Sequence, residues 1–97
     1  MKFTSYIKYA AAPALITASR AQHRAYLATL FEERKLLLAG PFTDDSGAMF
    51  MFEAEHEQQV RDWIEADPFF VAGIFVDIDT RPWKSVFANV DALRASA

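Results

Sequence analysis

The segment from Ala48 to Phe52 is apolar on both faces of the strand that its sequence predicts. In an extended chain, Ala48, Phe50 and Phe52 point one way, while Met49 and Met51 point the other way. A strand that is apolar on both faces has to be covered on both sides. Helices of the same chain can cover one side, so something else must cover the other.

Three other segments have the pattern of strands. They are short, they alternate between two faces or form a brief apolar run, and they lie at residues 3–9, 36–39 and 73–81. Gly40-Pro41 is predicted to end the second of these strands, and Pro82-Trp83 the third. The loop at residues 42–47 has the short polar side chains of a turn, and Gly47 is expected to supply a positive φ angle.

Two segments have helical periodicity. The first runs from residue 13 to about residue 35, and Phe31 is expected to widen its apolar stripe. The second is predicted at residues 53–66 and stops before Pro68, because the residue that precedes a proline avoids helical geometry. Residues 69–72 are then expected to form a connection.

The resulting order is strand, helix, strand, strand, helix, strand, the split βαβ arrangement of ferredoxin-like α+β domains. It places two helices on one face of a four-stranded antiparallel sheet and leaves the other face bare. Because that face carries large apolar groups, we expect a homodimer, or a higher oligomer, formed by packing of two sheets. Residues 88–97 are expected to be a C-terminal tail beyond a domain at residues 1–87, with a short helix capped by Asn89.

Composition and charge narrow the classes of partner. The net charge is −3 and no cluster of Lys and Arg occurs, which argues against nucleic-acid binding. No apolar run approaches the roughly 20 residues that span a bilayer, and the N-terminus lacks a signal-peptide core, so a cytoplasmic protein without membrane contact is expected. The chain has no cysteine and no ligands at metal-site spacing, so neither a metal nor another cofactor is expected.

Two residues on the inward helical stripes carry the candidate chemistry. His23 shares a stripe with Ile16 and Leu27, and an imidazole there is either a general acid or base, or a core-edge group bonded to a carbonyl. Asp67 ends the second stripe, where the helix dipole disfavours a carboxylate, unless it only initiates the turn before Pro68. A carboxylate beside the imidazole would fix its tautomer, and without a recognisable nucleophile the pair suits proton transfer on a small molecule.

Three further residues are candidates for binding the substrate. Arg81, at the end of the last strand, could bind a carboxylate through both guanidinium branches, or could form an ordinary surface ion pair. Ser46, in the polar loop, could donate to an anionic oxygen. Tyr26, three residues after His23 on the first helix, is the third candidate.

From the N-terminus to about Phe87, the chain resembles the YCII-related family. The resemblance is carried by His23, Tyr26-Leu27, Lys35-Leu36-Leu37-Leu38-Ala39-Gly40-Pro41-Phe42, Gly47, Glu65-Ala66-Asp67-Pro68-Phe69, Gly73 and Arg81-Pro82-Trp83. It implies a ferredoxin-like fold that dimerises through its sheets, as in the dimeric α/β-barrel group, and a site that falls on His23 and Asp67.

The resemblance leaves two functional hypotheses open. A few members of the family look like enzymes of aromatic-compound breakdown, including dehydrochlorination of a chlorinated hydroxyquinol. The first hypothesis is therefore a small lyase or isomerase in which His23 moves a proton, Asp67 orients it, and Arg81 or donors near Ser46 hold an anionic oxygen. The second is a non-catalytic dimer that binds a small molecule or supports another protein, with the histidine–aspartate pair as a structural hydrogen bond.

Overall fold

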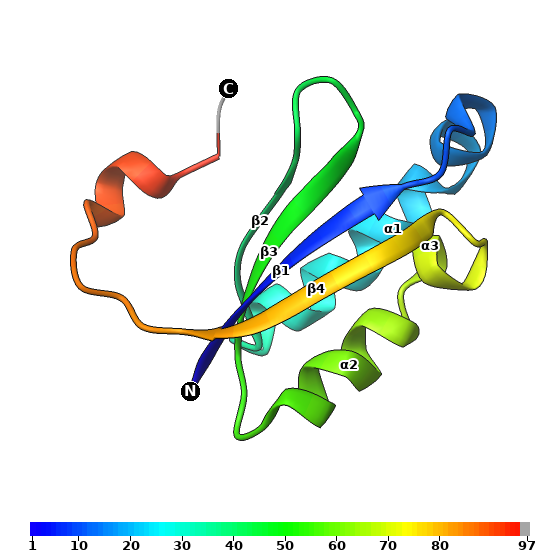
Figure 1. Cartoon of the computed structure of the whole chain (residues 1–97). Coiled ribbons are helices and arrows are strands. Elements are labelled where there is room, and N and C mark those ends of the chain that lie inside the picture. Colours follow the sequence, from blue (N-terminus) through cyan, green and yellow to red (C-terminus); the bar gives the residue numbers. More distant parts are fainter. Residues whose placement is uncertain (96–97) are drawn as a thin grey trace.

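The computed structural model describes residues 1–95 and contains a four-stranded antiparallel sheet with helices on one face (Figure 1). The elements, in chain order, are β1 (Lys2–Tyr9), α1 (Pro13–Glu32), β2 (Leu36–Pro41), β3 (Gly47–Glu53), α2 (Glu57–Glu65), α3 (Pro68–Val71), β4 (Phe75–Trp83) and the 3₁₀ helix η1 (Val90–Leu93). The strand order β2-β3-β1-β4 confirms the ferredoxin-like α+β fold expected from the order of elements. None of the helices among residues 1–95 combines the length and apolar character needed to cross a bilayer.

The core lies between the sheet and the helices. Phe3, Ile7, Phe50 and Phe52 project from the two central strands toward the helices, and each is at most 2% exposed. The antiparallel register sets Phe3 opposite Phe52, and Ile7 opposite Ala48, so the inner face is apolar from one end of the strands to the other. Burial of each large side chain contributes about 1.5–3 kcal/mol, which makes this layer the main source of stability.

Helix α1 packs on the sheet along a single line of residues. Ile16, His23 and Leu30 are buried and are spaced by seven residues, or nearly two helical turns. Phe31 lies about 100° around the helix from Leu30 and is 60% exposed, so the expectation that it widens the apolar stripe is wrong.

The end of α1 differs from the predicted end near residue 35. Helix α1 stops at Glu32 because Arg34 adopts a positive φ of 61°. The N–H of Arg34 then donates to the carbonyl of Phe31, and the N–H of Lys35 donates to that of Leu30. This is the Schellman arrangement, which satisfies two carbonyls that the helix leaves free.

Both outer strands continue through prolines that were predicted to end them. Strand β2 includes Gly40 and Pro41, and β4 includes Pro82 and Trp83. The strand order explains the difference, because β2 and β4 are the two edges of the sheet. An edge strand has one unpaired side, where the missing N–H of a proline costs no ladder hydrogen bond.

The second helical region is shorter and more divided than the sequence predicts. Glu53 belongs to β3, opposite Lys2, and its carboxylate accepts from the N-terminal amino group at 2.8 Å, so α2 begins only at Glu57. The segment expected to be a connection is the short helix α3, which starts at Pro68. Proline is favoured at the first position of a helix because its missing N–H would have no partner there.

Strand β4 begins at Phe75, two residues later than predicted, and contains an irregularity near its start. Tyr9 pairs with Phe75, but Lys8 pairs with Asp77, so Val76 is an extra residue in the ladder. The bulge lets Phe75 and Ile78 both face the helices, whereas strict alternation would place them on opposite sides. Val76 is 55% exposed as a result.

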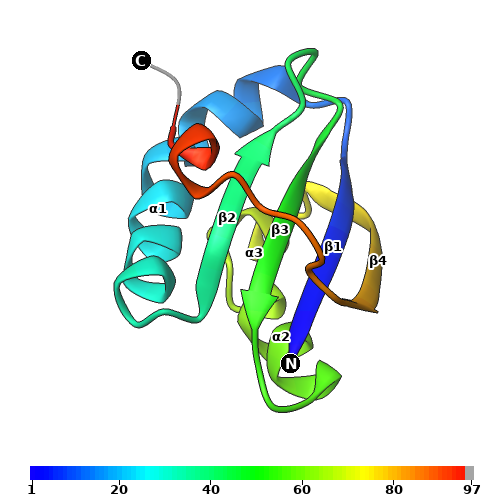
Figure 2. The same ribbon diagram turned by 90° about the vertical axis from the view of Figure 1, so that its left-hand side faces the viewer.

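The sheet face opposite α1 and α2 is not covered by a helix of the described chain (Figure 2). It carries Tyr6, which is 51% exposed, together with the half-buried side chains of Met49 and Met51. The same face carries three cations and three carboxylates, which are Lys2, Lys8, Arg81, Glu53, Asp77 and Asp79. We call this surface the open face.

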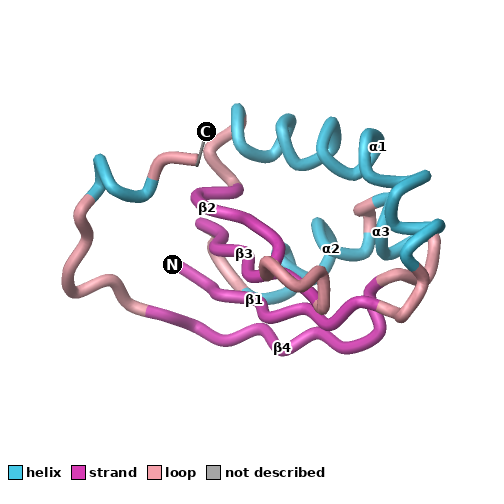
Figure 3. The backbone as a smooth tube through the Cα atoms, turned by 90° about the horizontal axis from the view of Figure 1, so that it is seen from above, coloured by secondary structure: helices cyan, strands magenta, loops and turns pink. Residues whose placement is uncertain are grey.

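The chain after β4 leaves the sheet in a wide loop (Figure 3) and passes in front of the open face in Figure 2. The expected short helix is present as the 3₁₀ helix η1, but the expected cap is wrong, because the side chain of Asn89 accepts no hydrogen bond from it. Val86, Phe87 and Val90 are 74%, 94% and 73% exposed. Residues 96–97 of the expected tail lie outside the described residues.

Gly47 is required for a reason other than the one predicted. The positive φ of the β2–β3 turn belongs to Asp45, at 58°, and not to Gly47. A Cβ atom on Gly47 would instead lie 2.0 Å from the carbonyl oxygen of Ile7 on the neighbouring strand. Gly47 therefore permits a close approach of the two central strands at the end of the sheet next to the β2–β3 turn.

Replacement of Gly47 by alanine should lower the free energy of unfolding by at least about 2 kcal/mol, because the strands would have to separate. Gly40→Ala is the matched control, since a Cβ atom at Gly40 meets nothing within 4 Å and its φ is not positive. Urea unfolding of both variants measures the difference. Equal effects of the two substitutions would show that the backbone contact does not limit stability.

Candidate functional site

The fold brings His23 of α1 and Asp67 of α3 together. The Nδ1 atom of His23 lies 2.7 Å from Oδ1 and 2.9 Å from Oδ2 of Asp67. The two side chains are 7% and 1% exposed. Burial on this scale strengthens an interaction between a carboxylate and a ring N–H, because little water competes for either group.

Asp67 lies in a more favourable position than the sequence indicated. It is the N-cap residue of α3, and its Oδ1 atom also accepts the backbone N–H of Phe69 at 2.8 Å. A carboxylate is favoured at the start of a helix, whereas the sequence analysis placed it at the disfavoured end of α2. The initiation of the turn before Pro68 and the contact with His23 are therefore two roles of one side chain.

The hydrogen bond with Asp67 determines which nitrogen of His23 is available. A carboxylate can only accept, so Nδ1 carries a proton and donates, and in the neutral ring Nε2 is then an acceptor. Within residues 1–95, Nε2 makes no hydrogen bond, and no buried side-chain nitrogen or oxygen lacks a partner. Nε2 therefore reaches the solvent-accessible surface, where it can exchange a proton with a bound molecule.

Aromatic rings hold the plane of the imidazole. The ring of His23 stacks on Phe69, with centroids 3.8 Å apart and planes 1° apart. Phe75 meets the imidazole edge-on at 6.2 Å, and Phe50 lies 6.3 Å away. The stack and the hydrogen bond together leave the imidazole little rotational freedom, which is the arrangement that positioned proton transfer needs.

Tyr9 lies beside the pair and was not singled out by the sequence analysis. Its ring packs edge-on against Phe69 at 5.6 Å and parallel to Phe75 at 6.0 Å, and it is 7% exposed. Burial, followed by the negative charge of Asp67, raises the pKa of Tyr9 to about 12. The alternation of the strand predicts an inward position for Tyr9 but no function. The signal that could have identified Tyr9 is a phenol hydroxyl at the last inward position of the strand.

Tyr26 and Ser46 were predicted to bind the substrate, and both have contacts within the chain. The hydroxyl of Tyr26 donates to the carbonyl of Trp63 at 2.6 Å and so links α1 to α2. Ser46 is exposed in the β2–β3 turn, and its carbonyl accepts the N–H of Tyr9 at 2.9 Å. Ser46 therefore adjoins the end of β1 at which Tyr9 lies.

Arg81, the third predicted substrate-binding residue, is not near the pair within one chain. It projects from β4 on the open face, where it is exposed and pairs with Asp79 at 3.1 Å. The hydrogen bond and charge of Asp79 raise the pKa of Arg81 above its ordinary value. The sheet lies between this guanidinium group and the helix side on which His23 packs.

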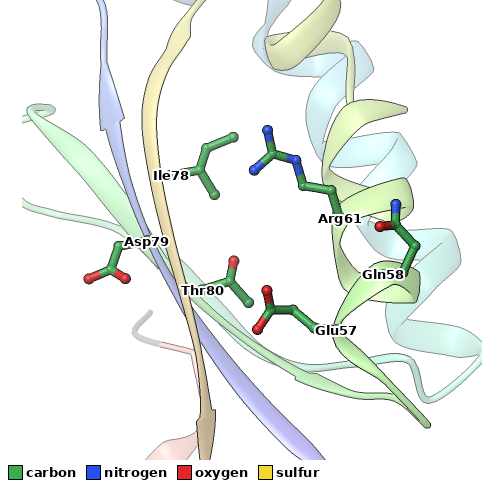
Figure 4. Close-up of a pocket in the computed structure, with 6 residues that line it drawn as sticks. All are labelled: Glu57, Gln58, Arg61, Ile78, Asp79 and Thr80. Carbon is green, nitrogen blue, oxygen red and sulfur yellow. The ribbon is translucent and has the colours of Figure 1, made fainter.

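A cleft of the described chain lies between α2 and β4 (Figure 4). Its volume is about 420 Å³, and the residues that line it are Glu57, Gln58, Arg61, Ile78, Asp79 and Thr80. In Figure 4, Glu57 and Arg61 extend from α2 toward β4, while Asp79 points away from the helix. A smaller cleft of about 300 Å³ adjoins it and is lined in part by Phe75, whose ring also packs edge-on against His23.

Among residues 1–95, no three histidine, aspartate or glutamate side chains come close enough to hold a metal ion. The Nε2 atom of His23, unpaired among these residues, is a group that can take part in acid–base chemistry.

The buried pair should be coupled in stability. Asp67→Ala is expected to lower the free energy of unfolding by about 3 kcal/mol or more, since it leaves Nδ1 of His23 without its partner. In a double-mutant cycle with His23→Ala, the coupling energy should be at least about 1 kcal/mol. The exposed pair Arg61–Glu65, at 2.9 Å, is the control and should give about 0.3–0.5 kcal/mol. Additive effects at His23 and Asp67 would contradict the pairing.

Ionisation of Tyr9 should be visible at high pH. The difference in 295-nm absorbance between the wild type and Tyr9→Phe should titrate near pH 12, well above the value of about 10 for an ordinary phenol. Between about pH 10 and pH 12, the unfolded chain loses the proton of Tyr9 before the folded chain does. The free energy of unfolding should therefore fall as the pH rises, by up to about 2–3 kcal/mol, and Tyr9→Phe should lack this component. A midpoint near pH 10 would show that the phenol is not shielded.

Comparison with known proteins bears out the resemblance seen in the sequence. The chain is 36% identical to an uncharacterised protein of Haemophilus influenzae, with 72% of this chain and 82% of that protein covered. It is 33% identical to the protein YciI of Escherichia coli, with 70% and 80% covered.

Several solved structures are similar to this chain, and two of them show the shared fold. One is the 5-chloro-2-hydroxyhydroquinone dehydrochlorinase TftG from Burkholderia phenoliruptrix, in complex with 2,5-dihydroxybenzoquinone. It is 32% identical, has a TM-score of 0.76, and the match covers 87% of this chain and 94% of that chain. The other is muconolactone isomerase, with a TM-score of 0.67, 15% identity, and 93% and 95% covered, which is a likeness of fold alone. The sequence also matches the YCII-related domain over residues 1–84, and the chain therefore belongs to the YCII-related family.

Proposed function

We propose that this protein is a small lyase or isomerase that moves a proton on a hydroxylated ring compound. The observation that carries the proposal is the buried contact between His23 and Asp67, which leaves Nε2 of His23 at the surface as the available nitrogen. The similarity to a dehydrochlorinase that binds 2,5-dihydroxybenzoquinone supports the class of substrate.

In this proposal His23 acts first as a general base. Its Nε2 atom takes the proton of a substrate C–H or O–H bond, and the electron pair of that bond stays on the substrate as an enolate or phenolate. In an isomerase, the imidazolium returns the proton to a different carbon. In a lyase, the electron pair expels an anionic leaving group, and the imidazolium passes its proton to water.

Asp67 is a positioning residue in this scheme. Its carboxylate keeps the proton of His23 on Nδ1, which leaves the lone pair of Nε2 directed outward, and it stabilises the imidazolium that forms. The second hydrogen bond, from the N–H of Phe69, fixes the carboxylate itself. The two contacts therefore hold the base in one tautomer and one orientation.

A non-catalytic dimer that binds a small molecule is the second candidate. Two observations favour it: His23 and Asp67 line neither of the two clefts described above, and Asp67 has a structural role as the cap of α3. In that case the contact between the two residues is a structural hydrogen bond, and a ligand would bind in the cleft between α2 and β4.

Turnover should distinguish the two candidates. We would supply 5-chloro-2-hydroxyhydroquinone and follow chloride release, and measure binding of 2,5-dihydroxybenzoquinone by calorimetry. His23→Asn should lower kcat by about 10²–10⁴-fold and leave the Kd nearly unchanged. His56→Asn is the matched control, because His56 is the exposed N-cap of α2, a position that asparagine also suits. A fall in binding in step with any activity, or binding without turnover in the wild type, would favour the second candidate.

The proposal includes a homodimer formed by the open face of two copies. Tyr6, Met49 and Met51 supply apolar area there, and the equal numbers of cations and carboxylates make the surface complementary to itself. Arg81 lies on this face, so the dimer would place it at the interface.

Sedimentation at micromolar concentration should give twice the 11.0 kDa mass of one chain. Met49→Lys should shift the protein to a monomer, because it places an unpaired charge in the apolar part of the interface. Val71→Lys, on α3 and already 77% exposed, is the control and should leave the mass unchanged. A monomeric wild type would remove the dimer from the account.

A further inference from the structure

One group of side chains near His23 has no role in the mechanism above. The phenol of Tyr9 is buried, and within residues 1–95 its hydroxyl forms no hydrogen bond. Arg20 and Arg24 lie on α1 on either side of His23, one turn apart, and Asp45 lies in the β2–β3 turn. Arg20 lies 3.9 Å from Asp45, and the carbonyl of the neighbouring Ser46 accepts the N–H of Tyr9 at 2.9 Å, so these charged groups adjoin the end of β1 at which Tyr9 lies.

We propose that Tyr9 and Arg20 form an anion-binding site for the molecule on which His23 acts. The hydroxyl of Tyr9 would donate to an anionic oxygen of the ligand, and the guanidinium group of Arg20 would supply the positive charge. The ligand class is then a ring compound with an ionised oxygen, such as an enolate, a phenolate or the oxygen of an ionised hydroxyquinone. The inference rests on the proposed function and names the substrate class of the same site.

The hydroxyl of Tyr9 is a donor without a partner among residues 1–95, so it is free to bind a ligand oxygen that accepts from it. No buried side-chain oxygen or nitrogen of residues 1–95 lacks a partner, so the hydroxyl reaches the surface. With a pKa of about 12, the phenol keeps its proton at neutral pH and acts as a donor.

The hydroxyl of Tyr9 and the imidazole of His23 share the same aromatic support. The rings of Tyr9 and His23 both pack against Phe69 and Phe75. The same two aromatic rings therefore fix the direction of the hydroxyl and of Nε2. When Nε2 takes a proton, the charge that develops on a substrate oxygen would be met by a donor that is already oriented, and such donors are worth about 10²–10³ in kcat.

Arg20 is only weakly held by its ion pair within the chain. Its guanidinium group is 3.9 Å from the carboxylate of Asp45, and the two side chains are 39% and 62% exposed. An ion pair this long and this exposed contributes little, so exchange of Asp45 for a ligand oxygen costs little. Arg20 is also less exposed than Arg24, and it reaches the β2–β3 turn that contacts Tyr9, which selects it as the partner cation.

Binding of two matched ring compounds tests the inference without any need for turnover. The probes are 2,5-dihydroxybenzoquinone, which is anionic at neutral pH, and 2,5-dimethoxybenzoquinone, which has no ionisable oxygen. Tyr9→Phe and Arg20→Gln should each weaken binding of the first probe by about tenfold and leave binding of the second unchanged. Lys84→Gln, which removes an exposed cation beyond β4, is the control for net charge.

The outcomes separate this inference from the proposed function. Unchanged binding of the anionic probe in both variants, or no binding of it to the wild type, would overturn the anion site. Loss of binding in both variants supports the site even if His23→Asn reveals no catalysis. Where turnover is measured, Tyr9→Phe should lower kcat by about 10²-fold with a smaller change in KM, because the oxyanion develops only in the transition state. A kcat that depends on His23 but not on Tyr9 would refute the inference alone.

Discussion

The hydrogen bond between His23 and Asp67 is the interaction on which the site depends. A carboxylate that is 1% exposed has to be met by donors, and Asp67 meets two, the ring N–H of His23 and the backbone N–H of Phe69. The same atoms therefore start α3, attach it to α1 and fix the imidazole. The same contact supports both the structure and the candidate chemistry. The activity of a variant at either residue therefore has to be interpreted together with its measured stability.

Because β3 is apolar on both faces, the sheet has two distinct sides. Phe50 and Phe52 fill the side covered by helices, where the polar groups of His23 and Tyr9 lie at the margin of the core. Met49 projects from the other face, together with the balanced charges that we assign to a dimer interface. The proposed chemistry and the proposed assembly are thus separated by the thickness of one sheet in a chain of 97 residues.

Periodicity predicted the element order, the sheet and the inward positions of the two site residues, because burial on one face leaves a repeat in the sequence. The errors arose where the outcome depends on neighbours that the pattern does not contain. Pro41 and Pro82 are tolerated within strands because β2 and β4 are edge strands. The bulge at Val76 depends on how β4 pairs with β1. The end of α1 depends on a left-handed Arg34, and the environment of Tyr9 exists only once α3 has packed.

Determination of the tautomer of His23 is the most direct test of its pairing with Asp67. Two-bond ¹H–¹⁵N correlation spectra of the imidazoles, recorded for the wild type and Asp67→Asn, report which ring nitrogen carries the proton in the neutral form. We expect Nδ1–H for His23 in the wild type, with Nε2 unprotonated, and loss of this preference in Asp67→Asn. An Nε2–H tautomer of His23, or identical spectra for the two proteins, would contradict the account.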